Sequence, residues 1–375
     1  MSRRRTLMIG TGAIAGAHAG AVAAHADRAV VGHGVDLDAG RAQGFAEQHG
    51  LASWGTDLAA ALAGGEDGPP DLAHICTPPG SHVPLAVQCL EAGVPVLLEK
   101  PPALSLAEVD ELLAVSERTG VDVAVVFQHR FGAGAERARR LLADGVLGRP
   151  LVATCHTLWF RDPEYFAVPW RGRWEVEGGG PTMGHGIHQI DLFLALLGPW
   201  EEVSAMAGRQ ARDTETEDVS TALVRFADGT LATIVNSLVS PRQTSSLRID
   251  TEHATLEVDH LYGYTDADWT FTPAPGSEQV AEHWVPDPDA PSSSHTGQVG
   301  VLLDALDAGT PLPVTLREAR DTLELVAAIY ASAFTGRTVR RGEIGPGHPF
   351  HSRMDGTGAP WMTTTTTTTT EGDHR

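Results

Sequence analysis

Short apolar segments alternate with helical patterns over the first third of the chain, and this alternation constrains the fold more than any other feature. The apolar segments predict strands at residues 7–9, 29–35, 72–76, 94–98 and 121–126. Helical patterns between them cover residues 41–49, 56–63, 84–92 and 106–118. Parallel strands need long crossover connections, which helices usually supply. We therefore predict an α/β fold that begins with a doubly wound parallel sheet.

After residue 131, strand runs with turn signals become more frequent. Helices are predicted at residues 133–143, 181–197, 297–308 and 316–334, and strands at 151–159, 221–226 and 231–237. Thr315 and Glu318 form a capping-box pattern at the start of the last helix. These features predict an α+β domain with a mainly antiparallel sheet.

The chain ends in a segment without apolar periodicity. Turn-forming residues follow position 342, and residues 363–370 are all threonine. Such segments bury too little apolar surface to offset the entropy of ordering. We therefore predict three regions, a parallel-sheet domain at residues 1–127, an α+β domain at 128–342 and a disordered tail at 343–375.

The charge balance excludes a nucleic-acid-binding surface as the main function. The chain carries 48 acidic against 27 basic residues, whereas phosphate backbones attract basic surfaces. Its three cysteines include no Cys-x-x-Cys pair, which argues against a disulfide framework and a structural zinc site.

The N-terminus imitates a secretory signal peptide, because Arg3-Arg4-Arg5 precedes an apolar stretch. Four glycines and His18 interrupt that stretch, so a strand, a turn and a helix fit it better. No run reaches the about 20 apolar residues of a membrane-spanning helix. We expect a cytoplasmic protein without a membrane or nucleic-acid partner.

A glycine turn, GTGAIA at residues 10–15, follows the first predicted strand. It is a G-x-G-x-x-A form of the dinucleotide-binding fingerprint, in which the first glycine allows a tight turn and the second lets a pyrophosphate approach. A small-residue turn without a ligand is the alternative, but the position between strand and helix favours nucleotide binding. The candidate cofactor-binding residues here are Gly10, Thr11, Gly12, Ala13 and Ile14.

Asp36 ends the second predicted strand, where a carboxylate accepts both hydroxyls of a ribose and repels a 2′-phosphate. Asp38 is a rival for this role, and both residues are also suited to capping the next helix. The expected cofactor is NAD, with NADP as the alternative.

One lysine stands out, because of the 27 lysine and arginine residues only Lys100 is a lysine. An ammonium group can lose or share a proton, which a guanidinium does poorly. Lys100 follows the strand predicted at 94–98, at the carboxyl edge where open α/β sheets bind ligands. We interpret it as a functional residue; the alternative is an ordinary surface lysine.

Several motifs, in this order, resemble the Gfo/Idh/MocA oxidoreductases, a family that includes inositol dehydrogenases. They are the glycine turn, TPPGSH at 77–82, EKP at 99–101, GGG at 178–180 and GIHQID at 186–191. The resemblance covers about residues 5–340 and implies a nucleotide domain followed by an open antiparallel sheet that often serves oligomerisation. A homodimer or homotetramer is therefore expected. It adds as candidate cofactor-binding residues Thr77, Pro78, His82, Glu99 and Lys100.

The same resemblance assigns catalytic roles to two residues. Lys100 is similar to the lysine that lies between nicotinamide and the substrate hydroxyl, and His188 to the histidine that acts as acid and base. Many sugar and inositol dehydrogenases of the family have an aspartate where this chain has Gly184. The adjacent His185 is a candidate to compensate for the missing carboxylate.

A loop at residues 159–174 is rich in aromatic residues and arginine. Aromatic faces stack on sugars and guanidinium groups bind hydroxyls or carboxylates; the alternative is a hydrophobic plug with solvated arginines. The candidate substrate-binding residues are Arg130, Trp159, Arg161, Trp170, Arg171 and His185. Gln128 is a candidate contact to nicotinamide.

His185, His188 and Asp191 share a helix face, which also suits a metal site, but no second cluster supports one and no metal is expected. The resemblance implies an NAD(P)-dependent oxidoreductase that transfers hydride between nicotinamide and a secondary alcohol or ketone of a sugar, inositol or related polyol. The alternatives are an NAD-dependent glycoside hydrolase or lyase with internal redox cycling, and a non-catalytic ligand sensor.

Overall fold

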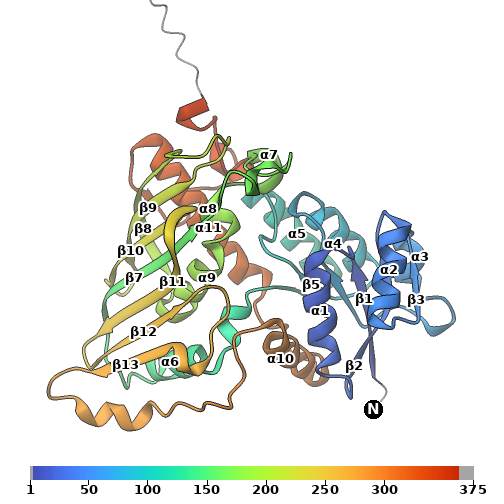
Figure 1. Cartoon of the computed structure of the whole chain (residues 1–375), viewed down its shortest axis with the longest axis horizontal. Coiled ribbons are helices and arrows are strands. Elements are labelled where there is room, and N and C mark those ends of the chain that lie inside the picture. The colour runs from blue at the N-terminus through green and yellow to red at the C-terminus, as the bar shows by residue number, and fades with distance from the viewer. Residues whose placement is uncertain (1–2, 363–375) are drawn as a thin grey trace, which may run out of the picture.

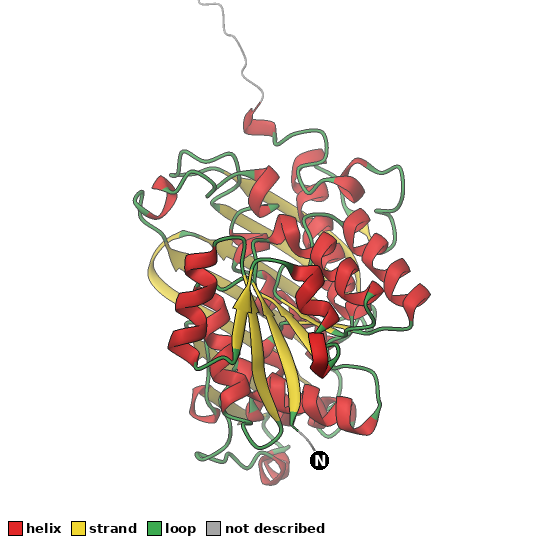
Figure 2. Cartoon of the chain, turned by 90° about the vertical axis from the view of Figure 1, so that its right-hand side faces the viewer, coloured by secondary structure: helices red, strands yellow, loops and turns green. Residues whose placement is uncertain are grey.

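The first domain is a parallel six-stranded sheet with helices on both faces (Figures 1 and 2). The computed structural model describes residues 3–362, and the strand order is β3-β2-β1-β4-β5-β6. The strands are β1 (Arg4–Ile9), β2 (Ala29–Val35), β3 (Ser53–Gly55), β4 (Leu72–Ile75), β5 (Val96–Leu98) and β6 (Val123–Val125). The helices are α1 (Ala13–Ala23), α2 (Ala39–His49), α3 (Leu58–Ala63), α4 (His82–Glu91) and α5 (Leu106–Thr119). The predicted doubly wound sheet is confirmed.

Burial on both faces explains why the central strands read as continuous apolar runs. In β1, Leu7 and Ile9 belong to one apolar core and Met8 to the core on the opposite face. The strand order reverses between β1 and β4, and open α/β sheets bind ligands at the carboxyl edge of such a point. The edge strand β3, which has three residues, was not predicted because it is too short to show a pattern.

The second domain is built on an eight-stranded sheet in the order β13-β12-β11-β7-β10-β9-β8-β14. Only β7 and β10 pair in parallel; the other pairs are antiparallel, as predicted. The strands are β7 (Pro150–Phe160), β8 (Trp200–Gly208), β9 (Val219–Phe226), β10 (Leu231–Ser237), β11 (Val239–Thr251), β12 (Ala254–His260), β13 (Trp269–Pro273) and β14 (Val339–Arg340).

Helices cover one face of this sheet and leave the other open (Figure 1). The covering helices are α6 (Ala133–Ala143), α8 (Pro181–Gly184), α9 (Ile187–Leu197) and α11 (Leu316–Thr335). The capping box predicted at the start of α11 is present, with Thr315 and Glu318 exchanging hydrogen bonds. On the open face, Met206 and Leu223 are among the exposed apolar side chains.

The helix predicted at 181–197 is divided into α8 and α9 by His185 and Gly186. A Cβ atom at Gly186 would lie 2.1 Å from Oδ1 of Asn236, so only glycine fits against β10 there. A pattern read along one segment cannot show this approach, which is why a single helix was expected. The break aims the start of α9 at the first domain.

Helix α10 (His295–Ala308) packs on α1 of the first domain, although it lies within the range predicted as the second (Figure 1). Its Val299, Leu302 and Leu303 complete the core that contains Met8. Helix α10 thus packs with the first domain although it follows the boundary predicted at residue 127, because the chain crosses back to the first sheet after β13.

The disorder predicted for residues 343–375 is wrong for residues 343–362. Helix α12 (Pro349–Ser352) packs on α5 and α11, burying Phe350, and His351 hydrogen-bonds Asp110 at 2.8 Å. A four-residue helix is too short to show a period in the sequence. The threonine run at 363–370 lies outside the described residues. None of the helices in residues 3–362 is long and apolar enough to span a membrane.

Candidate active site

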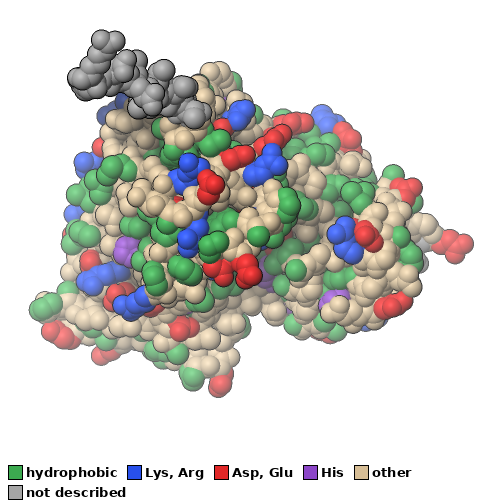
Figure 3. Space-filling view, turned by 45° about the horizontal axis from the view of Figure 1, so that its top comes forward, with side chains coloured by type: hydrophobic (Ala, Val, Ile, Leu, Met, Phe, Trp, Pro, Cys, Tyr) green, Lys and Arg blue, Asp and Glu red, His purple; other side chains and the backbone are tan. Residues whose placement is uncertain are grey.

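A cavity of about 600 Å³ lies where the two domains meet, at the carboxyl edge of β4 and β5. The surface view in Figure 3 shows a hollow between the two lobes, with acidic and basic side chains interspersed around it. The first domain contributes Pro78, Pro79, Lys100 and Pro101 to the cavity wall. The second contributes Trp159, Tyr165, Trp170, Arg171, Val176, Glu177, Gly184, His185, His188 and Tyr262.

The glycine turn after β1 has the geometry of a phosphate-binding turn. Gly10 has φ 82°, and a Cβ atom there would lie 2.6 Å from a Thr77 methyl carbon, so the position requires glycine. At Gly12, the N-cap of α1, a Cβ atom would meet nothing within 4 Å, and no side chain caps the helix. The first amides of α1, including those of Ala13 and Ile14, therefore lack a side-chain cap, as at a helix start that binds phosphate.

Asp36 lies beside this turn as expected. Its carboxylate accepts hydrogen bonds from the Thr11 amide at 2.9 Å and from the Arg41 guanidinium at 3.1 Å. Burial raises the pKa of Asp36, but hydrogen bonds from the Asp38 and Thr11 amides outweigh burial and lower it, so the group is ionised at neutral pH. Asp38, its rival, caps α2 by accepting from the Arg41 amide.

Two residues expected to contact the cofactor bind other parts of the protein. The ring nitrogens of His82 face the carbonyl oxygens of Thr77 and Pro101 at 2.8 and 2.9 Å, so this buried side chain holds two loops together. Glu99 directs its carboxylate inward, against His18 at 3.0 Å. Neither side chain offers a free polar atom to a ligand, whereas Pro78 lines the cavity wall.

Lys100 extends into the cavity and donates a hydrogen bond from Nζ to the Gly184 carbonyl oxygen at 3.1 Å. Burial lowers the pKa of Lys100, Glu99 opposes this shift, and the nearby Arg171 adds to it. A Cβ atom at Gly184 would meet nothing within 4 Å. The position where the family resemblance implies an aspartate thus supplies an oxygen to the lysine through its backbone.

His188, at the start of α9, lines the same cavity and is buried. Within residues 3–362, neither of its ring nitrogens has a hydrogen-bond partner. Burial lowers the pKa of His188 well below its usual value near 6.5, and the Lys100 charge lowers it further. The imidazole is therefore neutral at pH 7 and has a free nitrogen with which to accept a proton.

Arg130 is a predicted substrate contact, but it does not line the cavity. Its guanidinium makes two hydrogen bonds to Asp191, at 2.6 and 2.7 Å, and a third to Glu318. A buried carboxylate needs such a partner. This pair ties the segment after β6 to α9, and it removes Asp191 from the metal set considered with His185 and His188.

The predicted aromatic and arginine loop forms one stack along the cavity rim. The Arg161 guanidinium lies over Trp159 at 4.8 Å and over Tyr165 at 5.3 Å. Arg171 lies over the other end of the stack, at 4.1 Å from the Tyr165 ring centroid and 4.2 Å from that of Trp170. Arg161 does not line the cavity itself; it contacts Trp159 and Tyr165, which do.

Two polar residues of the cavity wall, Tyr262 and Glu177, lie outside the motifs and the loop singled out in the sequence. Tyr262 follows β12, and its hydroxyl accepts a hydrogen bond from Gln128 at 3.0 Å. Glu177, at the end of α7 (Trp174–Glu177), pairs with Arg171 at 3.1 Å. Both lie in segments without a local motif; only the glycine triplet that follows at 178–180 marks the neighbourhood of Glu177.

Two family models match the chain. One, described as the oxidoreductase family with an NAD-binding Rossmann fold, matches residues 4–127; the other, the GFO/IDH/MocA C-terminal domain, matches residues 113–257. D-glucoside 3-dehydrogenase of Escherichia coli is 34% identical over 42% of this chain, an alignment that spans only 44% of that protein. D-apiose dehydrogenase of Paraburkholderia graminis is 27% identical over 81% of both chains.

A solved structure is similar over almost the whole chain. The WlbA dehydrogenase from Bordetella pertussis, in complex with NADH and UDP-GlcNAcA, is 28% identical and has a TM-score of 0.78. The match covers 90% of this chain and 99% of that one.

Proposed function

We propose that this chain, which belongs to the Gfo/Idh/MocA family of NAD-binding oxidoreductases, oxidises a secondary alcohol of a sugar or related polyol. One observation carries the proposal: a cationic lysine and a neutral histidine with free nitrogens, Lys100 and His188, line one cavity beside the dinucleotide turn. Alcohol oxidation needs a group that takes the hydroxyl proton and a group that stabilises the negative oxygen.

Bound NAD would supply a nicotinamide ring that accepts the hydride from the substrate carbon. The residues proposed to hold its phosphates are those of the turn from Gly10 to Ile14, and the helix start without a side-chain cap at Gly12 supports this. Asp36 is proposed to bind the ribose and to favour NAD over NADP. Thr77, Pro78 and Gln128 are proposed for the nicotinamide end.

The proton is proposed to move to His188. As the carbinol carbon loses its hydride, the hydroxyl proton passes to a free nitrogen of His188, and the Lys100 ammonium donates a hydrogen bond to the same oxygen. The products are a ketone, reduced nicotinamide and one proton. Gly184 stands where the family resemblance implies a carboxylate, and we propose that its carbonyl oxygen positions Lys100 instead.

A carbohydrate-like substrate is supported by the cavity rim and by the relatives. Trp159 and Trp170 offer aromatic faces, and Arg171 and His185 offer polar groups beside them. Glucoside and apiose dehydrogenases are among the similar proteins. We propose these four residues as the substrate contacts, with Arg161 holding Trp159 in place.

Two further proposals concern assembly and location. The open sheet face exposes Val152, Met206, Leu223 and Leu231, which supports pairing with a second copy in a homodimer or homotetramer. All three cysteines are buried and unpaired, which fits a reducing cytoplasm.

The test is to incubate the purified protein with NAD, and separately NADP, and a panel of sugars, inositols, sugar acids and glycosides, following reduced nicotinamide. We expect reduction with one substrate group. Cleavage of a glycoside without net reduction would instead establish the internal-redox hydrolase. Silence across the panel despite NAD binding would favour the sensor.

A further inference from the structure

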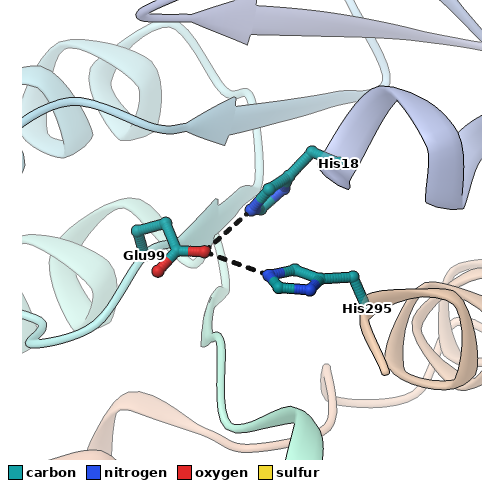
Figure 4. Close-up of side chains that lie close together, drawn as sticks. All are labelled: His18, Glu99 and His295. Carbon is teal, nitrogen blue, oxygen red and sulfur yellow. Dashed lines mark hydrogen bonds and ion pairs between the residues drawn. The ribbon is translucent and has the colours of Figure 1, made fainter. Parts of the chain in front are cut away.

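A buried cluster beneath Lys100 joins three distant parts of the chain (Figure 4). Oε1 of Glu99 contacts Nε2 of His18 at 3.0 Å and Nε2 of His295 at 3.2 Å. His18 lies on α1, Glu99 follows β5, and His295 is the first residue of α10. The cluster therefore forms only when α10 has docked on the first domain.

N–H donors within the protein are sufficient to make the hydrogen bonds of this cluster. His18 Nε2 donates to Glu99, so His18 Nδ1 is an acceptor, and it lies 3.0 Å from Nδ1 of His74, which donates. The second Glu99 oxygen accepts from the Lys100 backbone amide at 3.1 Å. Glu99 thus receives three N–H donors and stays ionised without a metal ion.

Lys100 has few sources of negative charge around it. The titratable or charged groups that face it are Glu99, Arg171, Glu177, His82, His129, His185 and His188. Burial keeps the histidines neutral by lowering their pKa values, and Glu177 is paired with Arg171. Tyr165 and Tyr262, on the cavity wall, have raised pKa values and are neutral. The Glu99 carboxylate, next to Lys100 in the chain, is held by N–H donors from His18, His295 and the Lys100 amide.

We infer that Glu99, held by His18 and His295, is a positioning residue for Lys100: it fixes the lysine backbone and supplies the charge that keeps the ammonium protonated during turnover. The inference rests on the proposed function of Lys100. The pKa directions agree with it. Burial would raise the pKa of Glu99, but the two histidine hydrogen bonds hold it well below its usual value. Burial lowers the pKa of Lys100, and the Glu99 charge is the largest influence that raises it.

The single lysine makes a direct test possible. Protein labelled with ¹³Cε-lysine gives one side-chain resonance, whose pH titration reports Lys100 without assignment. In Glu99→Gln we expect the titration midpoint to fall by about one pH unit or more, because one unit charge is removed from a buried site. The pH at which kcat is half lost on the alkaline side should fall by the same amount. NAD affinity should stay within about twofold of wild type. Glu91→Gln, the same change at an exposed ion pair, should leave both midpoints unchanged.

His295 gives a second pair of variants if Glu99→Gln fails to fold. His295→Gln keeps an N–H donor toward Glu99, whereas His295→Leu removes it. We expect a lower Lys100 midpoint in His295→Leu and a near-wild-type midpoint in His295→Gln.

An unchanged Lys100 midpoint in Glu99→Gln, or equal midpoints in both His295 variants, would overturn the inference. So would one equivalent of tightly bound metal in the purified protein that His295→Gln loses, because a metal would replace the N–H donors. The titration needs no substrate, so a shifted midpoint in a protein without dehydrogenase activity would refute only the proposed function. An unshifted midpoint in an active dehydrogenase would refute only the inference.

Discussion

Replacing Lys100 by methionine removes the only lysine of the chain and keeps the side-chain length. Within residues 3–362 the ammonium makes one hydrogen bond, to the Gly184 carbonyl oxygen, which leaves its other N–H groups for a substrate oxygen. Losing the internal bond costs about 1 kcal/mol of stability, offset in part because a buried charge is removed as well. The variant should therefore fold.

Its kinetics follow from the role of the ammonium. Removing one preorganised donor to a developing oxyanion lowers kcat by about 10²–10³-fold, or about 2.7–4 kcal/mol. NAD affinity should stay within about twofold, since the residues proposed to hold the phosphates and ribose are Gly12 and Asp36, not Lys100.

The assay is steady-state reduction of NAD with the substrate found in the panel, together with a fluorescence titration of NADH. Arg118→Met, which removes a cation from an exposed ion pair, is the matched control and should keep full activity. Lys100→Arg should recover little, because a planar guanidinium does not replace a compact ammonium. Activity of Lys100→Met within about threefold of wild type would refute the reasoning.

Four other predictions follow from the geometry. His188→Gln should lose most of kcat with little change in NADH affinity; kcat within about threefold of wild type would exclude His188 as the proton acceptor. NADP(H) should bind at least about tenfold more weakly than NAD(H), and Asp36→Ala should narrow the difference; equal titrations of the wild type would contradict this. Asp191→Asn should destabilise the fold by about 3 kcal/mol in denaturant unfolding, because Arg130 loses its buried counter-charge and keeps only the more exposed Glu318; a loss under about 1 kcal/mol would argue against that pair. Stability should fall as the pH drops below 6.5, since burial lowers the pKa of His129 to about 3 and of His260 to about 4 while the unfolded chain takes up protons near 6.5. The loss is about 1.4 kcal/mol per pH unit for each such histidine, and a melting temperature unchanged between pH 6.5 and 4.5 would refute it.

Local patterns were enough to predict the first sheet, the capping box of α11 and the turn at Gly10. Each depends on neighbours in sequence: an apolar run, a residue pair three apart, a glycine between strand and helix. The uniqueness of Lys100 likewise needs no structure, and it led to the cavity where His188 also lies.

Contacts between distant segments were beyond the same reasoning. From sequence alone Arg130 is predicted to bind a ligand at the sheet edge. In the structure its guanidinium donates to Asp191 and Glu318 instead. The sequence shows Glu99 only as part of a motif. In the structure it contacts His18 from α1 and His295 from α10, which are far apart in the chain. The docking of α10 and α12 depends on side-chain packing that the period of one segment does not encode.

The central claim is hydride transfer from substrate carbon to nicotinamide in this cavity. The most direct measurement uses the active substrate with deuterium at the carbinol carbon and identifies by mass spectrometry where the label goes. The account predicts one deuterium in the reduced nicotinamide and a slower turnover of the labelled substrate. Product that forms while the label stays on the sugar or passes to water would contradict it.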